Sequence, residues 1–426
     1  MKLNIKRTLV FALFALAVIA LVQIKAITLE AAAGICVLAL VAGEVTFGNR
    51  AAVFSGGVTP TFLFDFEKNM QTIQENEYIR LVQDLWWSKI ARLRPSGSKA
   101  ERINWLLSTA MIRSEGKGGN KQFDDLVQLT KEYVNRNAGA GFEVTRDQLD
   151  DLDGGGLDLA GQWSRDIGAY MAYWPQKQVI KAILNGEAPA SLAYDNVSYF
   201  SGWNAGTHTG NHPYNPYNVA LGGYANLLTG AADVGSGYSY PGALPIDASV
   251  TTDVALANVA KAVAYVRSIK MPNGEDPRKL KAVGIFNPPA MSPRVQQLTN
   301  AKFVAQAATG GGAGSADVEY LIRNWGFTMP TEVDEFAGNF SYVLDMEDGG
   351  GTVSGTDTTW YLACEQQSSS QLGALTYVDR EPFSVPMFGD QAFPELSRKR
   401  KLEYHCKGRN VTGYGHPFLL FKIKAT

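Results

Sequence analysis

One long helix with an aromatic stripe is the feature of this sequence that most constrains its fold. Large apolar residues recur at intervals of four, three and four, which places them on one helical face: Trp163, Ile167, Tyr170 and Trp174. An apolar helical face is normally buried, so we expect this stripe to face a core. Pro175 predicts a kink or a break, after which the pattern resumes and ends near Asn185.

The chain before this helix predicts an arm and a projecting loop. Residues 65–87 carry apolar side chains at roughly helical spacing and lead into a basic, turn-rich segment at 92–99. Beyond it, the sequence RINWLLSTAMI at 102–112 leads into the Gly-rich, charged tip EGKGGNKQFDD, and β-prone pieces around Tyr133 and Phe142 flank the sequence NRNAGAG. We expect a long two-stranded loop that projects from the body. A lone β-ribbon buries too little apolar surface to offset its chain entropy, so this loop is expected to need a neighbour.

The chain after the helix predicts a mixed domain. Residues 195–250 are rich in Gly, Tyr, Asn and Pro, and a helix at 254–269 precedes the buried strand LKAVGIFN. Further strands and a helix that begins at Ser292 interleave, which indicates a compact α/β domain. The tail returns to a β pattern, with a turn predicted at Arg409 and Asn410.

The N-terminus is strongly apolar. Basic residues at 2, 6 and 7 precede an apolar run at 9–22, and a second run covers 31–43. Each run is shorter than the ~20 residues that cross a bilayer comfortably. A signal peptide, a membrane anchor and a hydrophobic arm buried between subunits all stay open, because composition favours the membrane readings and the rest of the chain opposes them.

Composition argues against several classes of protein. The 39 Lys and Arg against 41 Asp and Glu leave a net charge of −2, so no global positive field recruits nucleic acid. The three cysteines are odd in number and far apart, which disfavours a disulfide framework and a zinc site and predicts free thiols. The four histidines lack metal-ligand spacing, so no metal or cofactor is predicted.

Three charged groups allow a functional interpretation beside a structural one. Acidic residues at 150, 151, 153 and 158 suit a helix N-terminus better than a calcium loop, whose closing Glu is missing. His208 and His212 with Asp195 could form a hydrolytic site, but no activated Ser or Cys accompanies them. The basic run at 398–401 is expected to be exposed charge, with contact to DNA or to a neighbour's acidic loop as the alternative.

Several sequence segments between residues 100 and 426 occur in an order that indicates a family resemblance. They are INWLLSTAMI with GKGGNKQFDDL, EYVNRNAGAGFEVTRDQLDD, YDNVSYFS with NHPYNPYN, KMPNGEDPRKLKAVGIFNPP, WYLAC and KLEYHCKGRNVTGYGHPFLLFKI. In this order they resemble the Mu-like phage major head subunit family, which builds on the Hong Kong 97-like capsid fold. The resemblance implies an α+β fold with an N-terminal arm, an extended β loop, a peripheral domain with a long spine helix, and a mixed α/β axial domain.

The resemblance also implies a division of the chain. The expected parts are a hydrophobic segment outside the family's usual pattern (1–50), the arm (51–100), the extended loop (101–130), the peripheral domain (131–194 and 383–426) and the axial domain with inserted loops (195–382).

The function that the resemblance implies is structural. We expect a major capsid protein, not an enzyme, that assembles in the host cytoplasm as pentamers and hexamers of itself into the icosahedral shell of the virion. A portal, a scaffold or a maturation protease are the expected partners, and contact with packaged DNA or of the N-terminus with a membrane is left open. The alternative is an exported or membrane-anchored binding protein that uses the N-terminal apolar segment.

The arm and the loop are expected to carry the subunit contacts, since broad protein interfaces draw on aromatic residues. The candidate interface residues are Phe66, Trp86, Trp87, Trp105, Arg113, Lys117, Lys121, Phe123 and Asp124. No catalytic, cofactor-binding or metal-binding residue is predicted.

Overall fold

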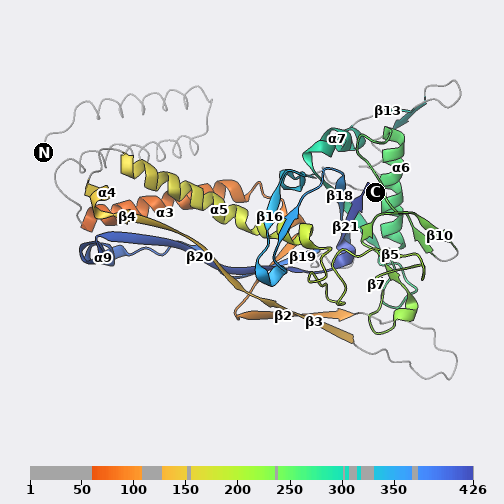
Figure 1. Cartoon of the computed structure of the whole chain (residues 1–426), viewed down its shortest axis with the longest axis horizontal. Coiled ribbons are helices and arrows are strands. Elements are labelled where there is room, and N and C mark those ends of the chain that lie inside the picture. The colour runs from red at the N-terminus through yellow and green to blue at the C-terminus, as the bar shows by residue number, and fades with distance from the viewer. Residues whose placement is uncertain are drawn as a thin grey trace, which may run out of the picture. The chain divides into compact units, whose positions relative to one another are not determined.

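The computed structural model describes residues 60–107, 127–150, 155–235, 238–300, 303–306, 314–317, 331–366 and 373–425 (Figure 1). The N-terminal apolar segment and residues 108–126 of the extended loop therefore lie outside the described residues. The chain divides into two compact units. The small unit takes its described residues from 1–70, 142–162 and 387–403, and the large unit comprises the remainder.

The small unit gathers three separate segments of chain. It contains the first half of α3 (Pro60–Val82), α4 (Arg146–Asp150), the start of α5 (Gly155–Asn185) and α9 (Ala392–Lys399). Its buried apolar side chains come from all three segments and include Leu63, Phe66, Val144 and Leu396. The buried carboxylate of Glu67 accepts hydrogen bonds from the backbone N–H of Phe388 (3.2 Å) and Gly389 (2.8 Å), which ties α3 to the chain before α9.

The large unit is built on a five-stranded sheet of order β15-β12-β18-β21-β9. Its strands are β9 (Leu227–Leu228), β12 (Leu280–Asn287), β15 (Thr331–Glu332), β18 (Thr359–Gln366) and β21 (Leu420–Lys424). The central strand β18 pairs antiparallel with both β12 and β21, and six of its eight residues are buried. Helices α6 (Thr252–Ser268) and α7 (Ser292–Asn300) pack beside this sheet, so the expected compact α/β region is present.

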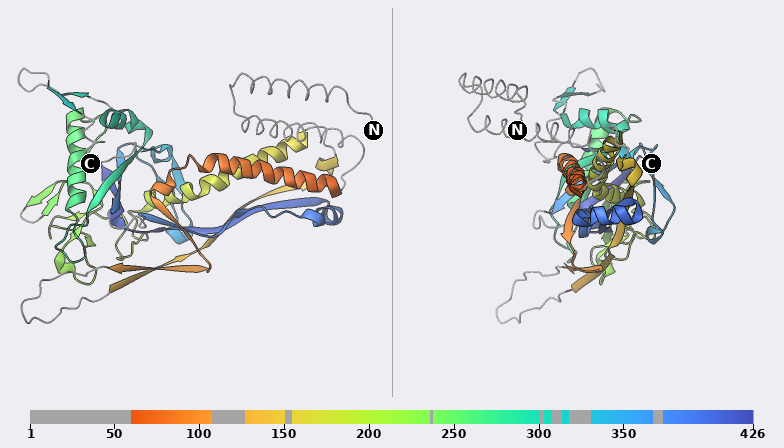
Figure 2. Two further views of the ribbon diagram at one scale, coloured as in Figure 1. Left: turned by 180° about the vertical axis from the view of Figure 1, so that it is seen from behind. Right: turned by 90° about the vertical axis from the view of Figure 1, so that its left-hand side faces the viewer.

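A second, four-stranded sheet has the order β1-β19-β20-β4. Its strands are β1 (Ala91–Pro95), β4 (Arg136–Thr145), β19 (Leu375–Ser384) and β20 (Lys401–Tyr414). Strand β1 runs parallel to β19, which pairs antiparallel with β20. Figure 2 shows α3 beside α5, and a Cβ at Gly168 of α5 would lie only 2.5 Å from the carbonyl oxygen of Gln74, so these two helices touch backbone to backbone.

Short paired strands complete the described structure. They are β2 (Ala100–Leu107) with β3 (Val127–Val134), β5 (Trp203–Asn204) with β6 (Thr209–Gly210), β7 (His212–Pro213) with β8 (Gly223–Tyr224), β10 (Asp233–Gly235) with β11 (Tyr238–Tyr240), β13 (Phe303–Gln306) with β14 (Gly314–Asp317), and β16 (Ser341–Val343) with β17 (Thr352–Ser354). Among the residues that the structure describes, no helix combines the length and the apolar character that crossing a membrane requires.

The fold class expected from the sequence is confirmed. The described chain is α+β and contains an arm helix (α3), a two-stranded loop (β2 and β3), a long spine helix (α5) with a flanking sheet, and a mixed α/β region.

Of the kink or break predicted at Pro175, the break does not occur. Helix α5 runs through Pro175 for 31 residues and ends at Asn185, as predicted. The residue before a proline normally avoids helical geometry, but here Trp174 is held from two sides. Its indole N–H donates to Asn410 Oδ1 at 2.8 Å, and its ring meets Phe383 edge-on at 5.8 Å. Tertiary packing thus stabilises a local conformation that the sequence disfavours.

Two predicted turns are also wrong, because long-range strand pairing overrides the local signals. The sequence NRNAGAG lies at the junction of β3 and β4, and β3 pairs with β2 instead of with β4. Strand β4 lies against β20 so closely that a Cβ at Gly139 would be 2.5 Å from the carbonyl oxygen of Cys406. Strand β20 continues through the predicted turn at Arg409 and Asn410, where Asn410 pairs with Asp379 of β19.

Candidate assembly surfaces

The antiparallel strands β2 and β3 form a ribbon, and its base is docked on the body of its own chain. Eight residue pairs join the strands, from Ala100 opposite Val134 to Leu107 opposite Val127. The hydroxyl of the buried Tyr133 donates to the carbonyl oxygen of Tyr414 at 2.7 Å. The expectation that this ribbon is ordered only by a neighbour is therefore wrong for its base, and its tip lies outside the described residues.

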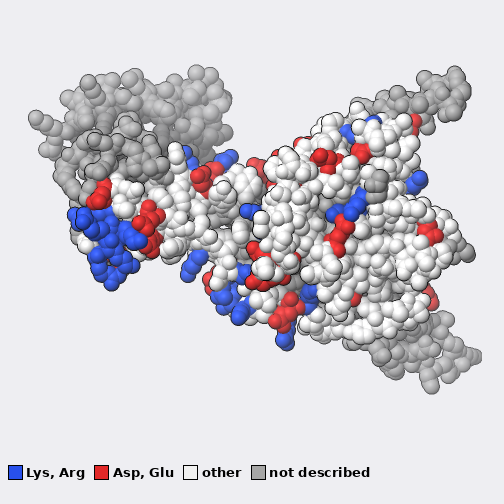
Figure 3. Space-filling model, in the orientation of Figure 1, with Lys and Arg blue, Asp and Glu red and all other residues white. Residues whose placement is uncertain are grey.

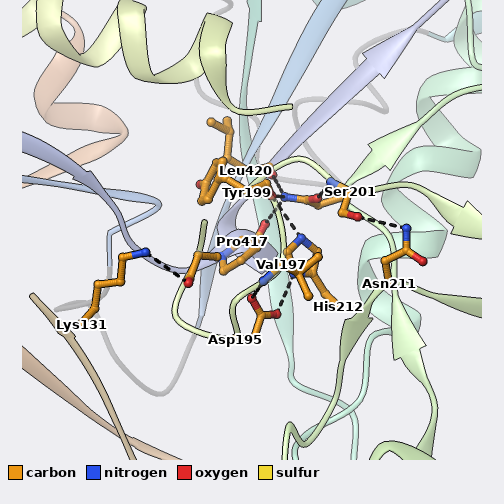
Figure 4. A network of polar contacts seen from close by, with 11 residues as sticks. Lys131, Asp195, Val197, Tyr199, Ser201, Asn211, His212, Pro417 and Leu420 are labelled. Atoms are coloured by element: carbon orange, nitrogen blue, oxygen red, sulfur yellow. Dashed lines mark hydrogen bonds and ion pairs between the residues drawn. The ribbon is translucent and has the colours of Figure 1, made fainter. Parts of the chain in front are cut away.

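Two further side chains hold the ribbon base. The half-buried ring of Trp105 lies 5.5 Å from the ring of Tyr194 and 5.4 Å from that of His416. Lys131 Nζ donates to the carbonyl oxygen of Leu192 at 2.5 Å, and the burial of this ammonium group lowers the pKa of Lys131 (Figure 4). The ribbon base is thus fixed by an aromatic contact on one strand and an ammonium group on the other.

The remaining predicted interface residues are spread through the chain. Phe66 is buried in the small unit, and Trp86 is buried in the core of the large unit against Phe286 and Phe336. Trp87 is partly buried with its ring 5.4 Å from that of Tyr377. Contacts within the chain thus cover most of the surface of these three side chains, which leaves little of it for a neighbouring subunit. The other candidates lie outside the described residues: Arg113, Lys117, Lys121, Phe123 and Asp124.

A groove that the sequence pattern does not indicate lies between α3, β1 and α5, and we call it the arm groove. It has a volume of about 440 Å³, and its lining includes Tyr78, Ile79, Trp87, Leu93, Met171 and Pro382. Ile79 and Leu93 are each 55% exposed, an unusual state for side chains of this size grouped around one hollow. Clustered exposed apolar side chains mark protein contact surfaces more often than single ones do.

A second groove lies between α5 and β4, and we call it the spine groove. It has a volume of about 270 Å³, and its lining includes Ala138, Ile167, Tyr170, Tyr173, Lys177 and Phe383. The predicted core-facing stripe is therefore wrong in part, since Ile167 is buried but Tyr170 is 69% exposed. The four-three-four spacing locates the helical face correctly, but it cannot show that one edge of that face has no cover within the chain.

The basic run at 398–401 is exposed and largely matched by acidic side chains of the small unit (Figure 3). Arg398 and Lys399 both pair with Glu395, and Arg400 lies 3.4 Å from Asp147. Lys401 contacts Glu143 and Glu403. Each basic side chain of this run therefore has at least one acidic neighbour in the small unit. Exposed pairs of this kind contribute little to stability, because solvent screens them.

The predicted histidine group is divided between two places. His212 and Asp195 are buried, with Nδ1 2.7 Å from Oδ2, and His212 Nε2 lies 3.1 Å from the carbonyl oxygen of Tyr199 (Figure 4). His208 pairs with Asp233 instead, at 2.9 Å. The His212 contacts hold the loops after α5 together, which is a structural role. Among the described residues, no three side chains gather that could hold a metal ion, and Cys364 and Cys406 are free thiols.

Comparison with protein families gives one match. Residues 66–218, which include the arm helix, the ribbon and the spine helix, match the family of the Mu-like prophage major head subunit gpT. The resemblance seen in the sequence is confirmed over this range. The match supports a major capsid protein of a tailed phage with a place in the virion capsid. No curated protein matches the chain in sequence.

The solved structures that match the chain include phage capsids and a virus-like particle. The capsid of bacteriophage JBD30 has a TM-score of 0.38 and 10% identity, and the match covers 79% of this chain and 64% of that chain. The capsid of cyanophage P-SCSP1u has a TM-score of 0.45 and 12% identity, with 79% and 86% covered. The virus-like particle from Pyrococcus furiosus has a TM-score of 0.38 and 8% identity, with 82% and 97% covered. Likeness at these values says nothing of function.

Proposed function

We propose that this chain is the major capsid protein of a tailed phage or prophage and assembles with copies of itself into the icosahedral shell around the packaged genome. The observation that carries the proposal is the match of residues 66–218 to the Mu-like major head subunit family. The same proposal gives the chain no catalytic role, and the buried, structural setting of His212 and Asp195 supports that.

A shell subunit needs two unlike surfaces that join head to tail around closed rings. We assign one of them to the tip of the β2–β3 ribbon, with the candidate contacts Arg113, Lys117, Lys121, Phe123 and Asp124. The arm groove and the spine groove provide exposed apolar and aromatic surface for the other. Aromatic side chains such as Tyr78 and Tyr170 are the kind that contribute most to interface energies.

We take the domain division, the mode of assembly and the partners from the family resemblance. Residues 131–194 and 383–426 form the peripheral domain and 195–382 the axial domain, with 51–100 as the arm and 101–130 as the extended loop. Assembly through pentamers and hexamers involves a portal, a scaffold or a maturation protease. The nearly balanced charge of the basic run favours weak, non-specific contact with packaged DNA over tight binding.

Deleting residues 114–121 tests the proposal. The ribbon base is anchored by Tyr133 and Lys131, so a shortened tip leaves the body folded. We expect the wild-type chain to form shells in electron micrographs and the deletion variant to stay unassembled with an unchanged circular dichroism spectrum. Closed shells from the deletion variant would refute the assignment of the tip as a subunit contact.

The alternative, an exported or membrane-anchored binding protein, gains no support from the family match. Cell fractionation separates the two functions. Recovery of the chain in membranes or in the medium, with its N-terminus trimmed near Ala31, would favour the alternative. Recovery in sedimenting particles favours the capsid.

A further inference from the structure

The ring of His416 is buried without a hydrogen-bond partner. Only 9% of this residue is exposed, and neither Nδ1 nor Nε2 finds a donor or an acceptor among the described residues. Buried polar groups in folded proteins are almost always paired, so an unpaired imidazole is an exception that needs an explanation.

Three aromatic rings from different parts of the chain enclose His416. Trp105 of β2 lies 5.4 Å away, Tyr194 of the loop after α5 lies 5.6 Å away, and Phe418 of the short helix Pro417–Leu419 lies 5.0 Å away. We call these four residues the His416 cluster. Since Trp105 belongs to the ribbon, the cluster is one of the contacts that dock the ribbon base on the body.

The charged groups around the cluster disfavour a protonated, positively charged His416. The guanidinium of Arg278 lies 3.9 Å above the ring of Phe418, and it acts on His416 by charge repulsion. Two other titratable groups nearby are neutral tyrosines. Tyr194 lies against the His416 ring. Tyr133 of β3 contacts Trp105, and its hydroxyl donates to the carbonyl oxygen of Tyr414. The nearby carboxylate of Asp195 is held by His212.

We infer that His416 makes the docking of the ribbon base sensitive to acid. A protonated ring would carry two N–H donors and a positive charge into a place where, among the described residues, no acceptor and no carboxylate lies within hydrogen-bond distance of the ring. Protonation therefore favours a state in which Trp105 moves away and water reaches the imidazolium. The switch acts within a single chain, and only its link to shell assembly rests on the proposed function.

The direction of the effect follows from the pKa of His416. Burial, and then the charge of Arg278, lower this pKa to about 3 in the docked state, whereas an exposed histidine titrates near 6.5. Well above pH 6.5 the ring is neutral in both states, so docking is at full strength. Below pH 6.5 His416 is protonated in the open state but stays neutral in the docked state, so acid favours the open state. The opening equilibrium should then rise about 30-fold between pH 7.5 and pH 5, since each pH unit is worth a factor of ten.

Hydrogen–deuterium exchange of the full chain measures this opening directly. Peptides that cover 100–107 and 127–134 report on the ribbon, and peptides that cover β12 and β18 serve as an internal reference. After correction for intrinsic exchange, we expect ribbon protection in the wild-type chain to fall between pH 7.5 and pH 5 while the reference stays protected. In His416→Phe the ribbon should stay protected over the same range, because the ring no longer titrates.

His405→Gln is the matched control, since it removes an exposed histidine of β20 and should behave as the wild type. If His416→Phe fails to fold, His416→Leu replaces it. Ribbon protection that does not change with pH in the wild type, or that falls equally in the His416 variants, would overturn the inference. So would an NMR titration of the wild-type chain in which the His416 ring takes up a proton near pH 6.5 while the ribbon is still protected.

Discussion

At the scale of single residues, close backbone approaches decide which side chains the chain tolerates. Gly413 of β20 lies under the ring of Tyr133, and a Cβ there would be 1.9 Å from a ring carbon. Tyr133 cannot easily retreat, because its hydroxyl donates to the carbonyl oxygen of Tyr414 and its ring packs with Ile103 and Val378. The burial of Tyr133 also raises the pKa of its hydroxyl, which stays protonated and remains a donor.

Gly413→Ala should therefore weaken the ribbon base. The added methyl group forces the ring of Tyr133 out of its contact, at a cost of about 1–3 kcal/mol in the free energy of unfolding. Urea denaturation followed by circular dichroism measures this loss. Gly97→Ala is the control, because a Cβ at Gly97 meets nothing within 4 Å, and its stability should be unchanged. Equal stabilities of the two variants would contradict the geometry of the ribbon base.

At the scale of elements, the contact between α3 and α5 overrides local helix preference. Alanine is a better helix former than glycine by about 1 kcal/mol in an open helix. At Gly168, however, a Cβ would lie 2.5 Å from the carbonyl oxygen of Gln74 and 3.2 Å from Cβ of Glu77. Both neighbouring groups belong to α3, so the glycine is required by helix packing.

Gly168→Ala should accordingly destabilise the chain, against the trend of helix propensity. We expect a loss of about 1–3 kcal/mol in the free energy of unfolding as α3 is pushed away from α5. Thermal unfolding detects it, together with faster hydrogen exchange in peptides of residues 71–82. A variant as stable as the wild type, or more stable, would show that the two helices do not touch at this point.

Some helices and strands could be predicted from the sequence, and others could not. The spine helix and its end at Asn185, the two-stranded loop and the α/β interleaving were predictable, because periodicity and glycine signals are local. The continuation of α5 through Pro175 was not, since Trp174 is held by partners that are remote in sequence. The continuation of β20 through Asn410 was not either, since it depends on pairing with β19. The grooves could not be predicted for the same reason, because only the packing of remote segments leaves the helical residues Tyr170 and Ile79 exposed.

At the scale of the whole molecule, the exposed apolar side chains of the grooves predict association. Ile79→Ser removes apolar surface from the arm groove, and since Ile79 is 55% exposed the stability of the single chain should change by less than about 0.5 kcal/mol. The yield of shells in electron micrographs should fall severalfold. Val219→Ser changes a residue that is 72% exposed and outside both grooves, and should assemble as the wild type does. Equal yields from the two variants would remove the arm groove from the assembly surface.

The most direct test of the proposed function is the sedimentation of the full chain, expressed with a scaffold and a protease and inspected by electron microscopy. Assembly into a shell predicts large, closed particles of uniform size that contain the chain as their main component. A well-behaved monomer under all conditions would contradict the assignment of this chain as a capsid protein.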